Sequence, residues 1–222
     1  MKTPNLPSCI LFDLDGTIGN TLPLCLAAFR QSVEPFLNEK LSDAAIISRF
    51  GPTEGGMIRS LVGDHYEEAM ESYLIHYQRL HVGYSKPFDR IPEILDYLRF
   101  QGSFVGLVTG KGAKSTAITL DHYGMTHSFD SIKTGSDEGP VKGKRICEIL
   151  AEHDYPKDAV LYVGDAPSDI DDCRSVGVKI ASAAWAETAD VPALQAKSPD
   201  YLFRSTTDFE NFLKGRINAD KK

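Results

Sequence analysis

The pattern of apolar and polar positions changes twice along the chain. An apolar run at residues 8–12 stops abruptly at the polar segment 13–17, which predicts a buried strand whose carboxyl end opens into a loop. Between about residues 21 and 81, apolar side chains recur at helical spacing, interrupted by the turn-rich segment 50–56. This second stretch contains no convincing strand and predicts a block of helices.

After Pro87 the pattern becomes a regular alternation of short apolar runs and amphipathic segments. We expect strands over residues 103–108, 129–133, 159–163, 178–181 and 201–203, and helices over 91–100, 113–123, 141–153, 169–176, 191–196 and 208–214. Alternation of this kind is typical of a Rossmann-like α/β fold, in which helices cover both faces of a parallel sheet.

The helical block then reads as a small all-α domain inserted into the α/β fold. We expect a core domain of residues 1–19 and 86–222 and an inserted helical domain of residues 20–85. A chain of 222 residues with 42% hydrophobic residues is long and apolar enough to bury such a core.

Charge and cysteine usage exclude several classes of protein. Acidic residues outnumber basic ones by 31 to 24, which speaks against a nucleic-acid partner. The longest apolar run, Leu24 to Phe29, is too short to span a membrane, and the first residues lack the apolar segment of a signal peptide. Four widely spaced cysteines without a CxxC pair favour a reduced, cytoplasmic protein. We expect a monomer or a homodimer.

Polar side chains follow three of the predicted strands: Asp13 and Asp15 the first, Thr109 the second, and Asp165 and Asp169 a third. Ligands of parallel α/β sheets bind outside the carboxyl ends of the strands, so these groups share one crevice if the three strands are neighbours. Four carboxylates in one crevice repel each other and require a cation. Oxygen donors without His or Cys suit Mg²⁺.

A phosphate group in the same crevice would also need a basic partner. Lys142, at the start of a predicted helix, is the best-placed candidate, followed by Lys111 and Lys144. The six histidines are spread along the chain, and we assign none of them to metal binding or catalysis.

Four segments resemble the ordered motifs of the haloacid dehalogenase (HAD) superfamily. The segment 13–17, Asp-Leu-Asp-Gly-Thr, resembles motif I, and the apolar strand ending at Thr109 resembles motif II. Lys142 resembles the motif III lysine, and the segment 164–169, Gly-Asp-Ala-Pro-Ser-Asp, resembles motif IV. The motifs occur in the family's order and spacing across residues 10–170. The helical block is similar to the α-helical cap of the phosphoglycolate phosphatase-like branch.

This resemblance implies a Mg²⁺-dependent phosphatase that acts on a small anionic phosphomonoester through a phospho-aspartate. Asp13 would be the nucleophile, Asp15 the general acid and then base, and Lys142 the cation that neutralises the phosphate. Asp13, Asp165 and the carbonyl of Asp15 would hold Mg²⁺, with Asp169 supporting Lys142 or a metal-bound water.

The resemblance also implies a set of substrate contacts. Thr109 and Gly110, together with the amides after Asp13, would hold the phosphoryl oxygens, and Gly16 would let the backbone turn tightly beside them. We expect Arg49, or the loop 51–56, to contact the non-reacting end of the substrate, because this part of the cap often faces the core.

Three positions depart from the family pattern. Gly110 stands where many relatives carry Asn or another polar residue, and Asn20 stands where many carry Asp. Gly143 replaces the common Pro after Lys142, which leaves Lys144 as a competing motif III lysine.

Three other functions stay open. A phosphosugar mutase of the β-phosphoglucomutase type would usually carry a cap histidine near Cys25, and the sequence has none there. An inorganic pyrophosphatase is the second alternative. A catalytically silent protein that binds a phosphate ligand usually loses a motif aspartate, and all four are present.

Overall fold

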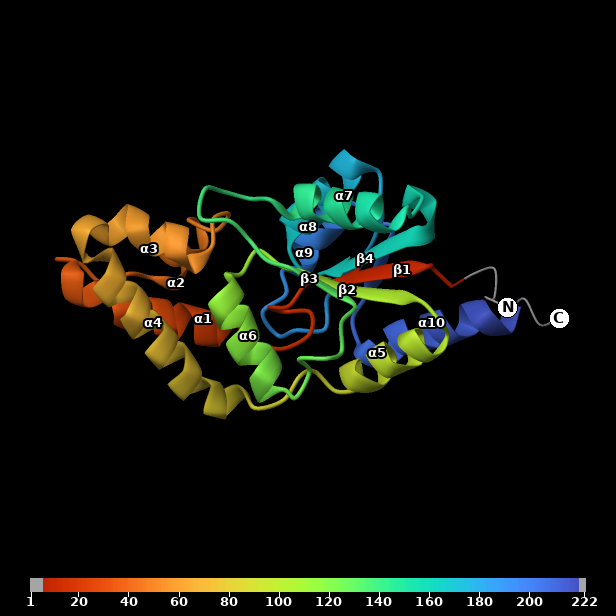
Figure 1. Cartoon of the computed structure of the whole chain (residues 1–222), viewed down its shortest axis with the longest axis horizontal. Helices are drawn as coiled ribbons and strands as arrows, with labels where there is room; N and C mark the ends of the chain where they lie inside the picture. Colours follow the sequence, from red (N-terminus) through yellow and green to blue (C-terminus); the bar gives the residue numbers. More distant parts are fainter. Residues whose placement is uncertain (1–5, 220–222) are drawn as a thin grey trace.

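A computed structural model describes residues 6–219 of the chain. Its centre is a sheet of six parallel strands in the order β3-β2-β1-β4-β5-β6 (Figure 1). The strands are β1 Cys9–Phe12, β2 Phe104–Val108, β3 Ser131–Lys133, β4 Val160–Gly164, β5 Lys179–Ala183 and β6 Tyr201–Phe203. Strand β1 lies between β2 and β4, and its last residue pairs with Leu107 on one side and Val163 on the other. The three strands that precede the motif residues are therefore neighbours.

Alternating side chains of the strands enter two hydrophobic layers. In β1, Ile10 and Phe12 belong to one buried cluster, and Cys9 and Leu11 to the other. The first cluster packs against α5 (Ile91–Phe100) and α10 (Thr206–Ala219), and the second against α7 (Lys142–His153), α8 (Pro167–Val176) and α9 (Val191–Ala196). Helix α6 (Ala113–His122) also adds Leu120 to the first cluster. Burial on both faces explains why the central strands β1, β2 and β4 are almost wholly apolar.

The stretch between β1 and α5 contains several helices and no strand. It contains α1 (Leu22–Val33), α2 (Asp43–Ile47), α3 (Glu54–Val62) and α4 (Tyr66–Leu80), joined by 3-10 turns at Glu34–Phe36, Gly63–His65 and His81–Tyr84. These helices enclose a third hydrophobic cluster of their own, built around the stacked rings of Tyr73 and Tyr77. In Figure 1 this block lies beyond the carboxyl end of the sheet, with α4 next to α6. We call it the helical block below.

The expected α/β class with its parallel sheet is confirmed, and every expected strand and helix after residue 86 is present. Helix α8 begins at Pro167, two residues earlier than expected, because the Asp169 carboxylate accepts a hydrogen bond from the Ala166 N–H and so caps the helix. None of the helices in the described part of the chain is long and apolar enough to cross a membrane.

Candidate active site

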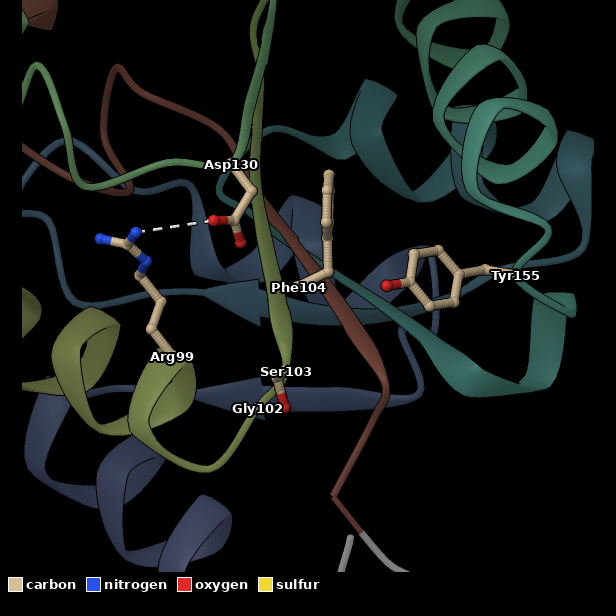
Figure 2. Close-up of a pocket in the computed structure, with 6 residues that line it drawn as sticks. All are labelled: Arg99, Gly102, Ser103, Phe104, Asp130 and Tyr155. Atoms are coloured by element: carbon tan, nitrogen blue, oxygen red, sulfur yellow. Dashed lines mark ion pairs between the residues drawn. The ribbon is translucent and has the colours of Figure 1, made fainter.

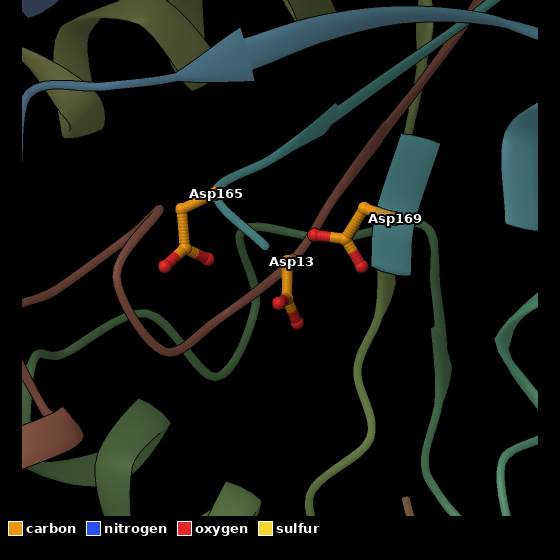
Figure 3. A group of neighbouring side chains, drawn as sticks. All are labelled: Asp13, Asp165 and Asp169. Atoms are coloured by element: carbon orange, nitrogen blue, oxygen red, sulfur yellow. The ribbon is translucent and has the colours of Figure 1, made fainter. Parts of the chain in front are cut away.

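Three carboxylates meet where β1 and β4 end. Asp13 follows β1, Asp165 follows β4, and Asp169 lies in the first turn of α8; one oxygen of each lies within 4.8 Å of the others (Figure 3). The Asp13 N–H donates to the carbonyl of Val163 at 2.8 Å, which extends the pairing of β1 with β4 by one residue and holds the Asp13 side chain beside Asp165. Motif residues that lie far apart in the sequence thus form one compact acidic cluster.

Lys142, the first residue of α7, is the cation of this cluster. Its Nζ lies 2.7 Å from Asp13 Oδ2 and 2.5 Å from Asp169 Oδ1. Burial by itself lowers the pKa of Lys142, but Asp13 and Asp169 outweigh burial and raise the pKa well above its usual value. The competing candidate, Lys144, is exposed. Of the two lysines that the sequence left open, Lys142 is therefore the one that reaches Asp13.

The acidic cluster has the properties of a divalent-cation site. Asp13 Oδ1 is buried and has no hydrogen-bond partner in the structure, although Oδ2 is bound by Lys142. Burial raises the pKa of Asp13 to about 6, with Lys142 opposing and Asp169 adding to the rise. Burial, then Asp13 and Asp169, likewise raise the pKa of Asp165 well above its usual value. Oxygen donors that crowd each other in this way suit Mg²⁺.

Gly16 packs directly against this cluster. Its φ of 78° is a left-handed conformation, and a Cβ at this position would collide with Asp165 Oδ2. The turn is closed by hydrogen bonds from the Ile18 N–H to the Leu14 carbonyl and from the Gly16 N–H to the Gly19 carbonyl. The glycine expected beside the phosphate is thus required here by the close approach of Asp165.

The side chain of Asp15 lies apart from the acidic cluster and faces the helical block. Its Oδ1 accepts a hydrogen bond from the Thr21 hydroxyl at 2.5 Å and lies 3.6 Å from Cys25 Sγ. Its Oδ2 lies 3.4 Å from Lys111 Nζ. The two aspartates of motif I therefore have separate partners, and the Asp15 side chain is not among the three that could hold a metal.

Two residues at the junction of sheet and helical block were not assigned from the sequence. Lys111 was only a secondary candidate for a phosphate partner, and its position two residues after Thr109 was the available signal. Glu54 lay inside the flagged turn-rich segment, but no pattern distinguished it. In the structure, Glu54 is buried, and its carboxylate accepts hydrogen bonds from the Gly112 N–H at 2.9 Å and the Ser115 hydroxyl at 2.5 Å. A side chain of the helical block thus caps the core helix α6.

The remaining expected substrate contacts have local partners. Thr109 is buried, and its Oγ1 accepts a hydrogen bond from the Lys111 N–H at 3.2 Å. A Cβ at Gly110 would lie 4.0 Å from the Lys142 Cε, so this glycine borders the cluster. The Arg49 guanidinium donates to the Ala45 carbonyl inside the helical block. Substrate contacts for these residues stay predictions.

A surface hollow at the other end of the sheet carries none of the motif residues. It is lined by Arg99, Ser103, Phe104, Asp130 and Tyr155, and Figure 2 shows it at the start of β2. An ion pair of 3.6 Å joins Arg99 to Asp130 across it. Because Phe104 begins β2 and Thr109 follows the end of this strand, the hollow is separated from the acidic cluster by the length of the strand.

The chain belongs to the family described as haloacid dehalogenase-like hydrolase, whose sequence profile it matches over residues 10–183. The chain is 27% identical over 214 residues to the phosphoglycolate phosphatase of Aquifex aeolicus, with 94% of this chain and 97% of that protein covered. It is 28% identical to the pyrophosphatase PpaX of Halalkalibacterium halodurans, with 90% and 93% covered. Its fold is similar to that of a hydrolase from Pseudomonas syringae, with a TM-score of 0.76, 20% identity and coverage of 93% and 98%.

Proposed function

We propose that this hydrolase is a Mg²⁺-dependent phosphatase that cleaves a small phosphomonoester through a phospho-aspartate intermediate. The observation that carries the proposal is the different surroundings of the two Asp13 carboxylate oxygens. One of its oxygens is held by Lys142 at 2.7 Å, and the other is buried, unpaired and next to Asp165. A buried carboxylate between a cation and a site for a second cation suits attack on a phosphoryl group.

The chemistry follows from the positions of the two motif I aspartates. An Asp13 oxygen attacks phosphorus, and the bond from phosphorus to the ester oxygen breaks. Asp15 lies two residues further along the same turn and donates a proton to the leaving oxygen. In the second half, Asp15 takes a proton from water that attacks the phospho-aspartate, and Asp13 is regenerated. Lys142 neutralises the transferred group throughout, and Asp169 keeps Lys142 in place.

Mg²⁺ would be held by Asp13, Asp165 and the carbonyl of Asp15, and it would supply charge neutralisation of the phosphoryl oxygens. Two observations support the fit of a cation. The Asp13 Oδ1 has no other partner, and burial and neighbouring carboxylates raise the pKa values of Asp13 and Asp165.

We propose that residues 20–85 act as a cap domain over a core of residues 1–19 and 86–222. Support comes from polar contacts between the two parts. The Thr53 hydroxyl donates to Asp137, and the Thr53 N–H donates to the Ser136 carbonyl at 2.9 Å. The Glu54 carboxylate binds the start of α6. Contacts of this kind hold the block against the core and exclude water from the reacting groups.

The names of the two curated relatives favour different substrates, phosphoglycolate and pyrophosphate. A phosphomonoester is our first candidate, and pyrophosphate is the second because the relative with that name is as similar as the other. A mutase is disfavoured by the thiol of Cys25, which occupies the position beside Asp15. We propose a cytoplasmic location on the ground that all four cysteines are free thiols.

The experiment is phosphate release from a panel of phosphomonoesters and pyrophosphate, with Mg²⁺, with a chelator, and with Mg²⁺ restored. We expect release only when the metal is present. Asp13→Asn keeps the shape of the side chain but removes the nucleophile, and we expect turnover to fall by about 10⁴-fold or more with the thermal unfolding profile preserved. Turnover by Asp13→Asn at the rate of the wild type would overturn the mechanism. Interconversion of phosphosugars without phosphate release would favour the mutase.

A further inference from the structure

A buried lysine contacts the second aspartate of motif I, as Lys142 contacts the first. The side chain of Lys111 is only 3% exposed, although it belongs to the loop between β2 and α6. Its Nζ lies 3.0 Å from Cys25 Sγ of α1 and 4.3 Å from the centre of the Tyr77 ring of α4. It lies 3.4 Å from Asp15 Oδ2. The ammonium group of a core residue is thus inserted into the helical block.

The charge of Lys111 is less fully balanced than that of Lys142. Within the described residues 6–219, Asp15 is the one carboxylate within 4 Å of Lys111 Nζ, and Asp15 also accepts from Thr21. The neighbouring sulfur, 3.0 Å away, belongs to the free thiol of Cys25 and is not a carboxylate. A neutral thiol and an aromatic face stabilise a buried cation less than a carboxylate does.

The other buried carboxylate at this junction, that of Glu54, already has hydrogen-bond partners. Both oxygens of Glu54 accept hydrogen bonds from the start of α6, one from the Gly112 N–H and one from the Ser115 hydroxyl. Glu54 therefore satisfies the amino end of the helix that begins two residues after Lys111, and it leaves the ammonium group to Asp15.

The arrangement of the lysines and aspartates indicates which further charge would balance the Lys111 ammonium group. Lys142 and Asp169 lie on the Asp13 side, where the phosphoryl group is proposed to bind. The Asp15 side chain, which is proposed to protonate the leaving oxygen, has other partners, and its Oδ2 lies 3.4 Å from Lys111 Nζ. A leaving group that projects from the ester oxygen past Asp15 therefore approaches the Lys111 ammonium group.

We propose that Lys111 recognises a negative charge on the leaving group, so that the substrate carries a carboxylate or a second phosphate close to the bond that is cleaved. This inference rests on the proposed phosphatase function and narrows its substrate class. It covers an ester of a small hydroxy acid and a phosphoanhydride alike, because both present an anionic oxygen within a few bonds of the leaving oxygen. It assigns to Lys111 the contact with the non-reacting end of the substrate that the sequence had suggested for Arg49 or the loop 51–56.

The test is a series of phosphate esters that differ only in the charge of the leaving group. O-phosphoethanolamine, ethyl phosphate and 2-phosphoglycolate have cationic, neutral and anionic leaving groups of similar length, and pyrophosphate provides the phosphate arm. We expect kcat/KM of the full-length, Mg²⁺-loaded protein to rise in that order, with about 10- to 100-fold between ethyl phosphate and the better of the two anionic compounds. Comparison of 2-phosphoglycolate with pyrophosphate then distinguishes a carboxylate from a phosphate.

Substitutions of Lys111 test whether this residue causes the preference for an anionic leaving group. In Lys111→Met, the ratio of kcat/KM between the anionic and the neutral compound should fall to near unity, and Lys111→Arg should retain a preference for the anionic compound. Lys114→Met removes an exposed lysine from the same end of α6 and should keep the ratio of the wild type. The ratio is internal to each variant, so a general loss of activity does not imitate the expected result.

The outcomes separate this inference from the function on which it rests. If the wild type hydrolyses p-nitrophenyl phosphate but shows no preference among the charged compounds, the inference is overturned and the phosphatase function stands. A preference that persists in Lys111→Met also overturns it. Release from none of the compounds overturns the phosphatase function, and this inference with it. If Lys111→Met does not fold, the kcat/KM values of the wild type and of Lys111→Arg across the series of leaving-group charges still test the inference.

Discussion

Lys142 and Lys111, whose side chains are 13% and 3% exposed, differ in what surrounds them. Lys142 is held by two carboxylates of the core at 2.7 and 2.5 Å. Lys111 contacts one carboxylate at 3.4 Å, and its other neighbours are a thiol and an aromatic ring supplied by the helical block. Both have pKa values raised well above the usual range, because nearby acidic groups outweigh the effect of burial.

This difference separates a part of the site that the core completes alone from a part that needs the helical block. The surroundings of Lys142 depend on strand ends and on the start of α8, so they are set by the sheet. The surroundings of Lys111 depend on how α1 and α4 pack against the core. A group common to all phosphate esters suits the first part, and the variable remainder of a substrate suits the second.

The largest effect is expected when Lys142, the cation of the acidic cluster, is removed. Lys142→Met leaves Asp13 and Asp169 buried without their shared partner, and we expect the free energy of unfolding to fall by about 3 kcal/mol in the absence of Mg²⁺. Urea unfolding monitored by circular dichroism measures this change. Lys144→Met, at an exposed position on the same helix, is the control and should stay within about 0.5 kcal/mol of the wild type. Equal effects of the two substitutions would contradict the assignment of Lys142.

A smaller effect is expected where the helical block meets α6. Glu54→Ala leaves the Gly112 N–H and the Ser115 hydroxyl without an acceptor, and we expect a loss of about 1–2 kcal/mol in the free energy of unfolding. Because the contact joins the two parts of the chain, hydrogen exchange at the first turn of α6 should also become faster. Glu71→Ala removes an exposed acidic residue of α4 and should change neither quantity.

The smallest expected effect concerns His81, which is buried where the helical block returns to the core. Its Nε2 lies 3.1 Å from Thr119 Oγ1, and its ring packs against Tyr77 of α4, against His122 of α6 and against Tyr123, which follows α6. Burial first, and then the charges of His122 and Lys111, lower the pKa of His81, while backbone hydrogen bonds oppose this.

The sign of the pH dependence follows from that shift. A histidine whose pKa is lower in the folded chain takes up its proton more readily when unfolded, so its contribution destabilises the fold as the pH drops below about 6.5. We expect His81→Gln to lose less stability than the wild type between pH 7 and pH 5 in thermal unfolding. His127→Gln, at an exposed position, is the matched control. The same slope in wild type and His81→Gln would refute the role of this histidine.

The architecture was predictable because the sheet is buried on both faces. Short apolar runs separated by amphipathic segments have few other solutions, and helix α5 was expected over the same residues, 91–100, at which it is found. The acidic cluster was predictable for a related reason. Once β1, β2 and β4 are parallel neighbours, the residues that follow them must meet at one edge.

The partners of Asp15 and Glu54 could not be read from local pattern. Lys111 is 96 residues from Asp15 in the sequence, and the group that Glu54 caps begins 58 residues away. Nothing in the periodicity of either segment shows which turn of the helical block faces which loop of the core. The same holds for the choice between Lys142 and Lys144, which are neighbours on α7 but differ in burial.

By itself, then, the sequence determined the elements, their order and the residues that end the central strands, because hydrophobic periodicity and strand polarity act over short distances. The tertiary structure alone decided which charges neutralise each other. The strength of an ion pair depends on distances and burial that exist only in the folded chain. Folding of the sheet and its helices places Lys142 between two carboxylates, and packing of the helical block adds a thiol and an aromatic ring around Lys111, which has one carboxylate.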